Sequence, residues 1–198
     1  MINNLCNSKS NNDIYNILET RRSIRYFNQN TVSNELLNKI VNTARFAPSA
    51  MNKQPWEFII VNKKELVKQI FKNISLLAGS YPNENQSAPV YIVVLGNKFA
   101  SKTYDVDCAF ATSNILNAAW AEGLGSCVIG SVDKNAVKQL LNIPNSMEIC
   151  WLIQIGYPAE TPIALDSKEH NLKRTINEQG IFIVPKRSLQ DILHVNKY

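Results

Sequence analysis

The segment from Asp105 to Glu122 constrains the fold of this chain most, because it predicts a long helix that is apolar on almost every side. Its apolar residues are Val106, Ala109, Phe110, Ile115, Leu116, Ala118, Ala119 and Trp120. A helix of this kind must be covered all round. In a chain of 198 residues, we expect part of that cover to come from a second copy of the chain.

Strands and further helices are expected before and after this helix along the chain. Short apolar runs, partly β-branched, predict strands at 56–61, 90–95, 126–129 and 147–155, and the run at 56–61 is expected to be buried. Helical spacing predicts helices at 13–20, 34–47, 63–78 and 134–141, with Ser33 as an N-cap. The last segment predicts one more short apolar run and a terminal helical turn. Helices that alternate with about four strands indicate an α+β or α/β class.

The organisation along the chain predicts a single domain over residues 1–198, because there is no internal repeat and no linker. Residues 1–12 are rich in Asn, Ser and Lys and are expected to be a loose leader. Residues 160–198, where the hydrophobic pattern weakens, are expected to be a tail that packs on a partner subunit.

Composition narrows the location and the partners. No stretch approaches the ~20 consecutive apolar residues of a membrane helix, and the N-terminus lacks a secretory h-region, so no membrane is expected. The net charge is +5, but the basic residues are scattered, so a nucleic-acid partner is not expected. The four cysteines form no C-x-x-C pair, which argues against zinc and a disulfide scaffold and favours a reducing cytoplasm.

Three motifs carry chemical content. The first, Arg21-Arg22-Ser23-Ile24-Arg25, gathers three guanidinium groups and a hydroxyl, which would suit a phosphate. The same residues could simply be a solvated basic helix end, favoured by the helix dipole. Both readings stay open at this point.

The second motif is the loop from Ala47 to Trp56, in which two prolines frame the polar residues Ser49, Asn52 and Gln54. Such groups could hydrogen-bond the edge of a heteroaromatic ring, or the segment could be an ordinary proline-capped loop. The third motif, Gly123 to Ser131, contains three glycines after a helix, where backbone could approach a flat ligand. It lacks the dinucleotide-binding fingerprint. The alternative interpretation, a helix C-cap followed by a turn, accounts for Gly123 but not for the other glycines.

Together these motifs resemble the nitroreductase family. Its members show R-R-S-x-R-x-F, then P-S-x-x-N-x-Q-P-W, then G-L-G-S, then I-G-Y-P, and this chain has all four in that order, the last as Ile155 to Pro158. The resemblance extends from about Asn12 to Glu178. It implies a three-layer α/β/α fold with a central, mostly antiparallel sheet flanked by helices, and an intertwined homodimer with FMN at the interface.

The resemblance also implies which residues hold the cofactor. Arg21, Ser23 and the neighbouring Arg22 match the positions near the FMN phosphate and ribityl chain, and Arg25 matches the cation at the flavin N1 edge. Those matching the loop of the second subunit are Pro48, Ser49, Ala50, Asn52 and Gln54. Those matching the ring face and N5 edge are Val128, Ile129, Gly130 and Ser131, and Lys173 and Arg174 match a basic tail that reaches the phosphate.

The implied activity is hydride transfer from NADH or NADPH through FMN to nitroaromatics, quinones, enones or flavins by a ping-pong mechanism. Arg25, Gly130 and Ser131 are the expected catalytic residues; His170 and His194 are expected to lie at the surface, and no metal is expected. Larger relatives carry an acidic residue at the position of Gly130, and an Asn and a Lys in the segment matching Ser80 and Asn83. Alternatives are a non-catalytic flavin-binding module and a flavin-destroying or dehalogenating relative on the same fold.

Overall fold

The computed structural model describes residues 11–75, 82–167 and 171–198. By their internal contacts the residues fall into two compact units. The larger unit spans residues 23–159, and the smaller one combines the N-terminal residues up to Arg22 with residues 160–198. Each is described by itself below. The prediction of one domain whose tail packs on a partner therefore stays a prediction.

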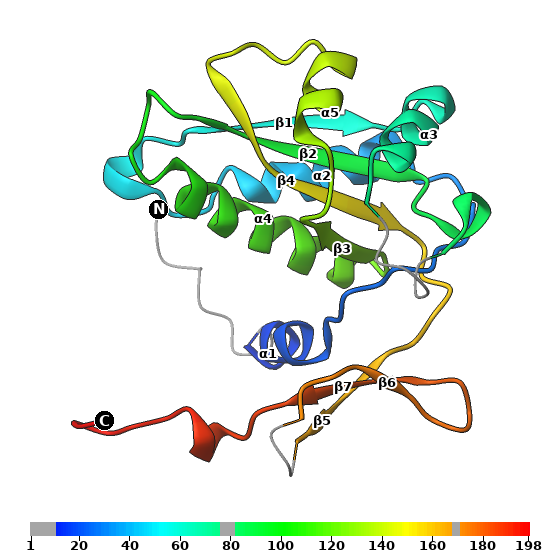
Figure 1. Ribbon diagram of the computed structural model, residues 1–198. Coiled ribbons are helices and arrows are strands. Elements are labelled where there is room, and N and C mark those ends of the chain that lie inside the picture. Colours follow the sequence, from blue (N-terminus) through cyan, green and yellow to red (C-terminus); the bar gives the residue numbers. More distant parts are fainter. Residues whose placement is uncertain (1–10, 76–81, 168–170) are drawn as a thin grey trace, which may run out of the picture. The chain divides into compact units, whose positions relative to one another are not determined.

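A four-stranded sheet forms the centre of the larger unit (Figure 1). Its strands are β1 (Trp56–Val61), β2 (Val90–Asn97), β3 (Gly125–Ile129) and β4 (Met147–Gly156), in the order β1-β2-β4-β3. All three neighbouring pairs are antiparallel. The predicted antiparallel sheet is confirmed, and each of its four strands lies within about two residues of the range that the sequence predicted.

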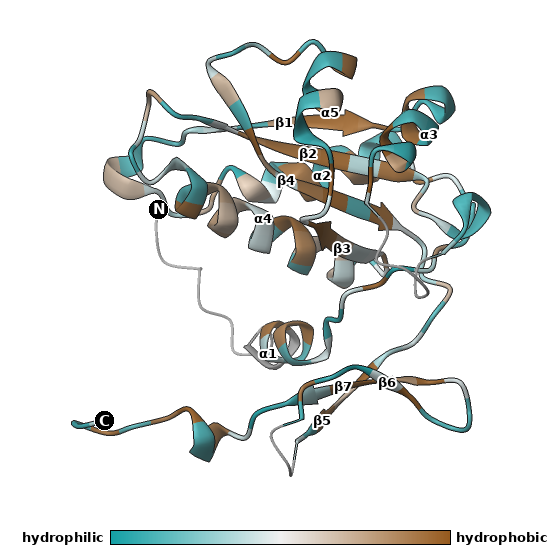
Figure 2. Cartoon of the chain, in the orientation of Figure 1, coloured by the Kyte–Doolittle hydropathy of each residue, from teal (hydrophilic) through white to brown (hydrophobic). Residues whose placement is uncertain are grey.

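Helices cover both faces of this sheet, which confirms the three-layer arrangement. Along β2 the side chains of Val90, Ile92 and Val94 join a core with α2 (Asn34–Ala44) and α4 (Tyr104–Ala121). The alternate residues of β2 join a second core with α3 (Lys64–Lys72) and α5 (Lys134–Leu140). Because successive side chains of a strand point to opposite faces, a strand buried on both faces is apolar throughout. Figure 2 shows this hydrophobic character along β2 and β4.

Two helices are shorter than the sequence predicted. Helix α3 ends at Lys72, with Asn73 as C-cap, instead of continuing to Ala78. Beyond it the backbone turns to pair with the segment after β3: Ser75 N–H donates to the Ser131 carbonyl at 2.8 Å. Tertiary hydrogen bonds thus replace the helical ones, and the predicted residues 76–78 lie outside the described ranges. Helix α2 begins after its predicted cap Ser33 but ends at Ala44, three residues before the predicted position.

The prediction that the strand at 56–61 is buried is wrong, whereas the prediction that a second copy covers part of the helix at 105–122 stays a prediction. Strand β1 is an edge strand, and only its terminal residues Trp56 and Val61 are buried. Helix α4 buries one side against the sheet and α2, whereas Val106 and Phe110 on another side are 50% and 49% exposed. These residues lie one helical turn apart and form an apolar strip that the described residues of the larger unit do not cover.

The smaller unit contains structure that the sequence pattern only partly indicated. It consists of α1 (Asn11–Thr20), a three-stranded sheet of β5 (Ile163–Asp166), β6 (Thr175–Ile176) and β7 (Phe182–Lys186), and the helical turn η3 (Leu189–Asp191). The order is β5-β7-β6, with β5 parallel and β6 antiparallel to β7. Strands β5 and β6 went unpredicted because they are short and mostly exposed, so they carry little apolar periodicity.

Within the described ranges, no helix is long and apolar enough to cross a membrane.

Candidate functional site

The segment after α1 is fixed to the start of β3 by backbone pairing. Ser23 forms a parallel bridge with Ser126, and Ile24 N–H donates to the Ser126 carbonyl at 3.0 Å. Ile24 is fully buried, and Gly125 gives it room: a Cβ on Gly125 would lie 2.7 Å from the Cβ of Ile24. Because the chain is extended here, Ser23 and Arg25 point away from the face of Ile24, and both are half-buried.

The same segment then pairs with the end of β4. Phe27 bridges Pro158, and the Ala159 N–H donates to the Tyr26 carbonyl at 2.9 Å. Gly156 permits this packing, because a Cβ there would lie 2.6 Å from Pro89 and 3.0 Å from the Phe27 ring. Three of the four motifs found in the sequence therefore meet at one end of the sheet, which we call the Gly125/Gly156 end after the paired first and last residues of β3 and β4.

The residues that follow along β3 lead away from this end, since Ile129 already pairs with Leu152 of β4. Val128 is half-buried against the core on the α4 side, while Ile129 is buried on the opposite face. Gly130 is exposed, and a Cβ on it would meet no atom within 4 Å. Neither a close approach nor a positive φ requires glycine at this position, so the space beside it can accommodate another molecule.

The loop from Pro48 to Pro55 is exposed and its backbone is strained. Met51, Asn52 and Gln54 have φ of 52°, 55° and 45°, in the left-handed region that non-glycine residues seldom adopt. The Ser49 hydroxyl accepts from Gln54 N–H at 3.0 Å, and the Gln54 amide donates to Asn52 Oδ1 at 3.1 Å. Such strain persists only where surrounding contacts hold it, and it is common at binding loops.

One buried carboxylate holds this loop. Asp107, 3% exposed in the first turn of α4, accepts the Ala50 N–H at 3.0 Å through Oδ1 and the Ser101 hydroxyl at 3.1 Å through Oδ2. Sequence reasoning missed Asp107. The signal available was a carboxylate within an apolar helix, since an unpaired buried charge is costly.

In a single chain the loop and the Ser23–Arg25 segment lie at opposite ends of the sheet. Trp56, which follows the loop, pairs with Gly96, and Gly96 pairs with Glu148. At the other end Val90 pairs with Ile155, whose other neighbour is Ser126. Six residue steps of β2 separate Val90 from Gly96, or about 20 Å. We call the end that carries the loop the Trp56/Gly96 end.

The remaining predicted ligands belong to the smaller unit. Arg22 donates to the carbonyls of Glu19 and Arg21, so it caps the end of α1, and burial followed by the neighbouring charge of Arg21 lowers its pKa. Arg174 forms an ion pair with Glu160 at 2.7 Å and stacks over the Phe182 ring at 3.5 Å. Lys173 is exposed. The helix-end reading of the arginine motif thus describes Arg22 in the chain alone, and Arg174 already has an acidic partner.

Of the two histidines, the structure describes His194. His194 is exposed and stacks with Tyr198, and His170 lies outside the described residues.

With this arrangement described, comparison with known proteins decides the family. The model of the Nitroreductase family matches residues 18–92 and 86–157, well over half of the chain. The chain belongs to the nitroreductase family. A relative from Archaeoglobus fulgidus, provisionally named an NADH dehydrogenase/NAD(P)H nitroreductase, is 34% identical over 151 residues, covering 73% of this chain and 84% of the relative.

Other members of this family differ in name. An iodotyrosine deiodinase from Thermotoga neapolitana is 26% identical, over 73% of this chain and 88% of its own. Among solved structures, an FMN-dependent nitroreductase from Clostridium difficile superposes with a TM-score of 0.71 at 26% identity, covering 93% of this chain and 99% of the other. Membership in the nitroreductase family is therefore secure, while the relatives of this chain carry the names of different enzymes.

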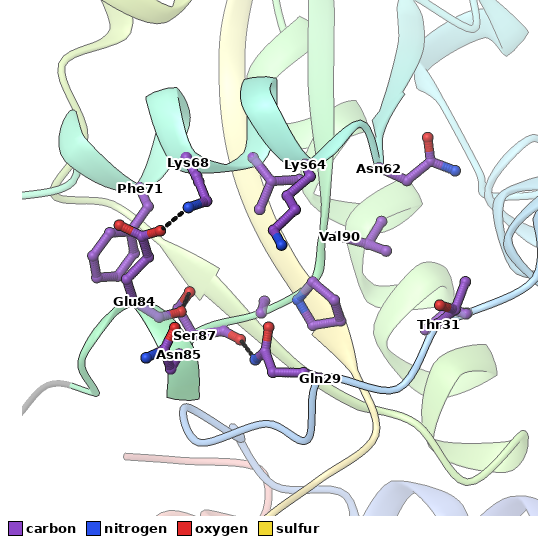
Figure 3. A pocket seen from close by; sticks show the side chains of 14 residues that line it. Gln29, Thr31, Asn62, Lys64, Lys68, Phe71, Glu84, Asn85, Ser87 and Val90 are labelled. Carbon is purple, nitrogen blue, oxygen red and sulfur yellow. Dashed lines mark hydrogen bonds and ion pairs between the residues drawn. The ribbon is translucent and has the colours of Figure 1, made fainter.

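A cavity of about 400 Å³ is lined by residues other than those predicted to bind a cofactor (Figure 3). Its rim carries Lys68 paired with Glu84 at 2.8 Å, and the Gln29 amide donates to the Ser87 carbonyl at 2.9 Å. Lys64 also lines it. None of the predicted site residues lines this cavity, so within the described ranges it is separate from the site built above.

Proposed function

We propose that this member of the nitroreductase family binds FMN and passes hydride from NAD(P)H to electron-poor acceptors such as nitroaromatics or quinones. The observation that carries the proposal is the backbone pairing of Ser23–Arg25 to β3. It fixes the backbone of a hydroxyl-bearing and a guanidinium-bearing residue next to Ser126, on the strand that leads to Val128–Gly130. The FMN-dependent relative of similar fold supports the choice of cofactor.

The residues at the Gly125/Gly156 end fit such a ligand. Ser23 and Arg25 are half-buried, so their side chains can reach a neighbouring molecule while their backbone stays fixed. The open space at Gly130 admits the edge of a flat ring against the backbone. Arg21 and Arg22 directly precede Ser23 in sequence, and we propose that they and the tail residues Lys173 and Arg174 bind the phosphate.

FMN, when bound, supplies a two-electron carrier. The chain's own contribution is positioning and charge. Arg25 would supply a fixed positive charge where negative charge gathers during reduction, and the backbone N–H groups of Gly130 and Ser131 would hold the ring edge by hydrogen bonds. NAD(P)H and the acceptor would use the same space in turn, which predicts ping-pong kinetics.

We further propose that the loop of one copy completes the site of a second copy. Within one chain about 20 Å of β2 separates the loop from Ser23, so Ser49, Asn52 and Gln54 cannot reach the same ring as Arg25. In the loop and near it, four large apolar residues are between 49% and 88% exposed: Phe46, Met51, Val106 and Phe110. A homodimer would cover this surface and bring the loop to the other copy's Gly125/Gly156 end.

The first experiment is to purify the protein without added cofactor, record its visible spectrum and identify any released chromophore by mass. A yellow protein that releases about one FMN per chain is the expected result. A colourless protein that also fails to bind added FMN would overturn the proposal.

The role of Arg25 has its own test. Arg25→Ala should slow reduction by NAD(P)H on the order of a hundredfold, with a smaller change in the FMN dissociation constant. Lys72→Ala, which removes one exposed positive charge from α3, is the control and should leave both unchanged. Equal reduction rates in stopped-flow measurements of Arg25→Ala and the unmodified enzyme would contradict this role.

Sedimentation tests the dimer. The protein should sediment as a dimer at micromolar concentration, and Phe110→Glu, which places a charge on the exposed strip of α4, should yield monomers with weaker FMN binding. A monomer that retains FMN would refute the shared site.

A second candidate activity is dehalogenation, which the deiodinase relative favours. Release of iodide from iodotyrosine by the reduced enzyme, faster than reduction of a nitroaromatic, would select it. Loss of the flavin itself with oxygen consumption would indicate a flavin-destroying relative. Tight FMN binding without any NAD(P)H oxidation would indicate a non-catalytic flavin module.

A further inference from the structure

Two cysteine thiols meet beneath Gly96, away from the proposed flavin residues. Cys108 lies on the side of α4 that faces the sheet, and Cys150 lies on β4. A Cβ built on Gly96 would be 2.7 Å from the Cys150 sulfur and 3.2 Å from the Cys108 sulfur. Both sulfurs therefore occupy the space that a side chain on Gly96 would fill, which places them next to each other.

An irregularity in the sheet places Cys150 there. Val94 pairs with Trp151, but the next residue, Leu95, pairs with Ile149, so Cys150 is an extra residue on β4 opposite the junction. A β-bulge of this kind turns the side chain of the extra residue to a new direction and is frequent near functional sites. Because of the bulge, Cys150 and Trp151 both belong to the core on the α4 side. Strict alternation from Leu152 would have placed Cys150 on the opposite face of the sheet.

The two thiols differ in accessibility and in charge environment. Cys108 is fully buried, whereas Cys150 is 9% exposed. The Lys134 ammonium donates to the Cys150 carbonyl at 3.4 Å. The neighbouring Cys108 thiol, followed by the charge of Lys134, lowers the pKa of Cys150, and the neighbouring Cys150 thiol together with burial raises the pKa of Cys108. Tyr104, Glu148 and Asp105 also face this pair.

We propose that Cys108 and Cys150 form a redox-active pair that a hydroperoxide oxidises to an intramolecular disulfide between α4 and β4. Cys150 is the attacking thiol, since it is the more accessible and lies beside the Lys134 ammonium, and Cys108 is the resolving thiol. The disulfide would fix the first turn of α4 one residue from Asp107, the carboxylate that holds the 48–55 loop.

The reaction balances with hydrogen peroxide as the oxidant. The Cys150 thiolate attacks one peroxide oxygen, the O–O bond breaks, and hydroxide leaves and takes up the proton lost by the thiol, giving water and a sulfenic acid. The Cys108 sulfur then attacks the sulfenic sulfur, the S–O bond breaks, and a second water leaves with the Cys108 proton. Two thiols and one peroxide yield one disulfide and two waters.

The experiment treats the native protein with equimolar hydrogen peroxide, alkylates the remaining thiols, and maps peptides without reduction. A linked peptide pair that contains Cys108 and Cys150, and that a dithiol reductant separates, is the expected result. Linkage through Cys127 or Cys6, or no linkage in the native protein, would overturn the proposal. Because this map uses the unmodified chain, it decides the question even if a variant folds poorly.

Variants then assign the two roles. Cys108→Ser should stop at a sulfenic acid on Cys150 that dimedone traps, and Cys150→Ser should leave Cys108 reduced. Cys127→Ser is the matched control: Cys127 is also buried, at 4% exposed, but it belongs to the core on the other face of the sheet. Its disulfide yield should equal that of the unmodified protein. Sulfenic acid on Cys108 in Cys150→Ser would reverse the assignment and refute it.

Discussion

The two ends of the central sheet are held together in different ways. At the Gly125/Gly156 end, an extended segment is bridged to β3 and β4 by backbone hydrogen bonds, and Ile24 and Phe27 are 0% and 2% exposed beneath it. At the Trp56/Gly96 end, the loop is exposed, three of its residues have positive φ, and Asp107 is the buried side chain that holds it. One end is held by backbone pairing over a buried core, whereas at the other a strained loop is held by its own hydrogen bonds and by the Asp107 carboxylate.

Truncation of Ile24 should have the largest effect, because it removes the side chain that anchors the rigid end. Ile24→Ala should lower the free energy of unfolding by about 2–5 kcal/mol, and Ile24→Val by about 0.5–1.5 kcal/mol, measured by chemical denaturation. If Ile24→Ala were as stable as the unmodified chain, the backbone bridges alone would hold this end.

Removal of the Asp107 carboxylate should destabilise the protein less but loosen the loop more. Asp107→Ala leaves the Ala50 N–H and the Ser101 hydroxyl without their acceptor, so we expect a loss of about 2–3 kcal/mol. Hydrogen exchange at Ala50 should accelerate, while exchange at Ile24 should not. Asp105→Ala, at an exposed position of the same helical turn, is the control. Equal protection of Ala50 in the Asp107 variant would show that the loop holds itself.

A pair of glycine substitutions sharpens the description of the rigid end. Gly125→Ala brings a Cβ to within 2.7 Å of Ile24, so it should destabilise by about 1–3 kcal/mol. Gly130→Ala meets no atom within 4 Å, and its free energy of unfolding should change by less than about 0.5 kcal/mol. A large loss at Gly130 would mean that the backbone there, rather than the space beside it, needs glycine.

The smallest effects should come from one lysine–glutamate cluster at each end. Lys68 lowers the pKa of Glu84, and Lys98 with Lys138 lowers that of Glu148. A lowered folded-state pKa stabilises the protein above the unfolded-state pKa, and this contribution is lost as the pH falls through the folded value. Denaturation between about pH 3 and 6 should show a shallow decline that salt reduces. Glu148→Gln should make the loss of stability with falling pH less steep. An unchanged pH dependence would show that the cluster around Glu148 contributes nothing.

Periodicity predicted the central unit well because its elements are long and their apolar patterns are unambiguous. The run at 90–95 became the buried strand β2, and the Ser33 cap begins α2 as expected. The predicted end of α3 is wrong because tertiary hydrogen bonds at Asn73 and Ser75 override the local helical preference. Strands β5 and β6 of the smaller unit were not predicted because short, exposed segments show little hydrophobic periodicity. The predicted flavin contacts and the dimer remain predictions.

The sequence by itself determined the family and the three-layer core, since motif order and hydrophobic periodicity are local properties that survive without coordinates. Only the tertiary structure decided that three motifs meet at one end of the sheet while the loop lies at the other, that Asp107 holds the loop, and that a bulge turns Cys150 toward Cys108. These are contacts between residues far apart in the chain. They depend on strand register and on burial, which no local pattern encodes.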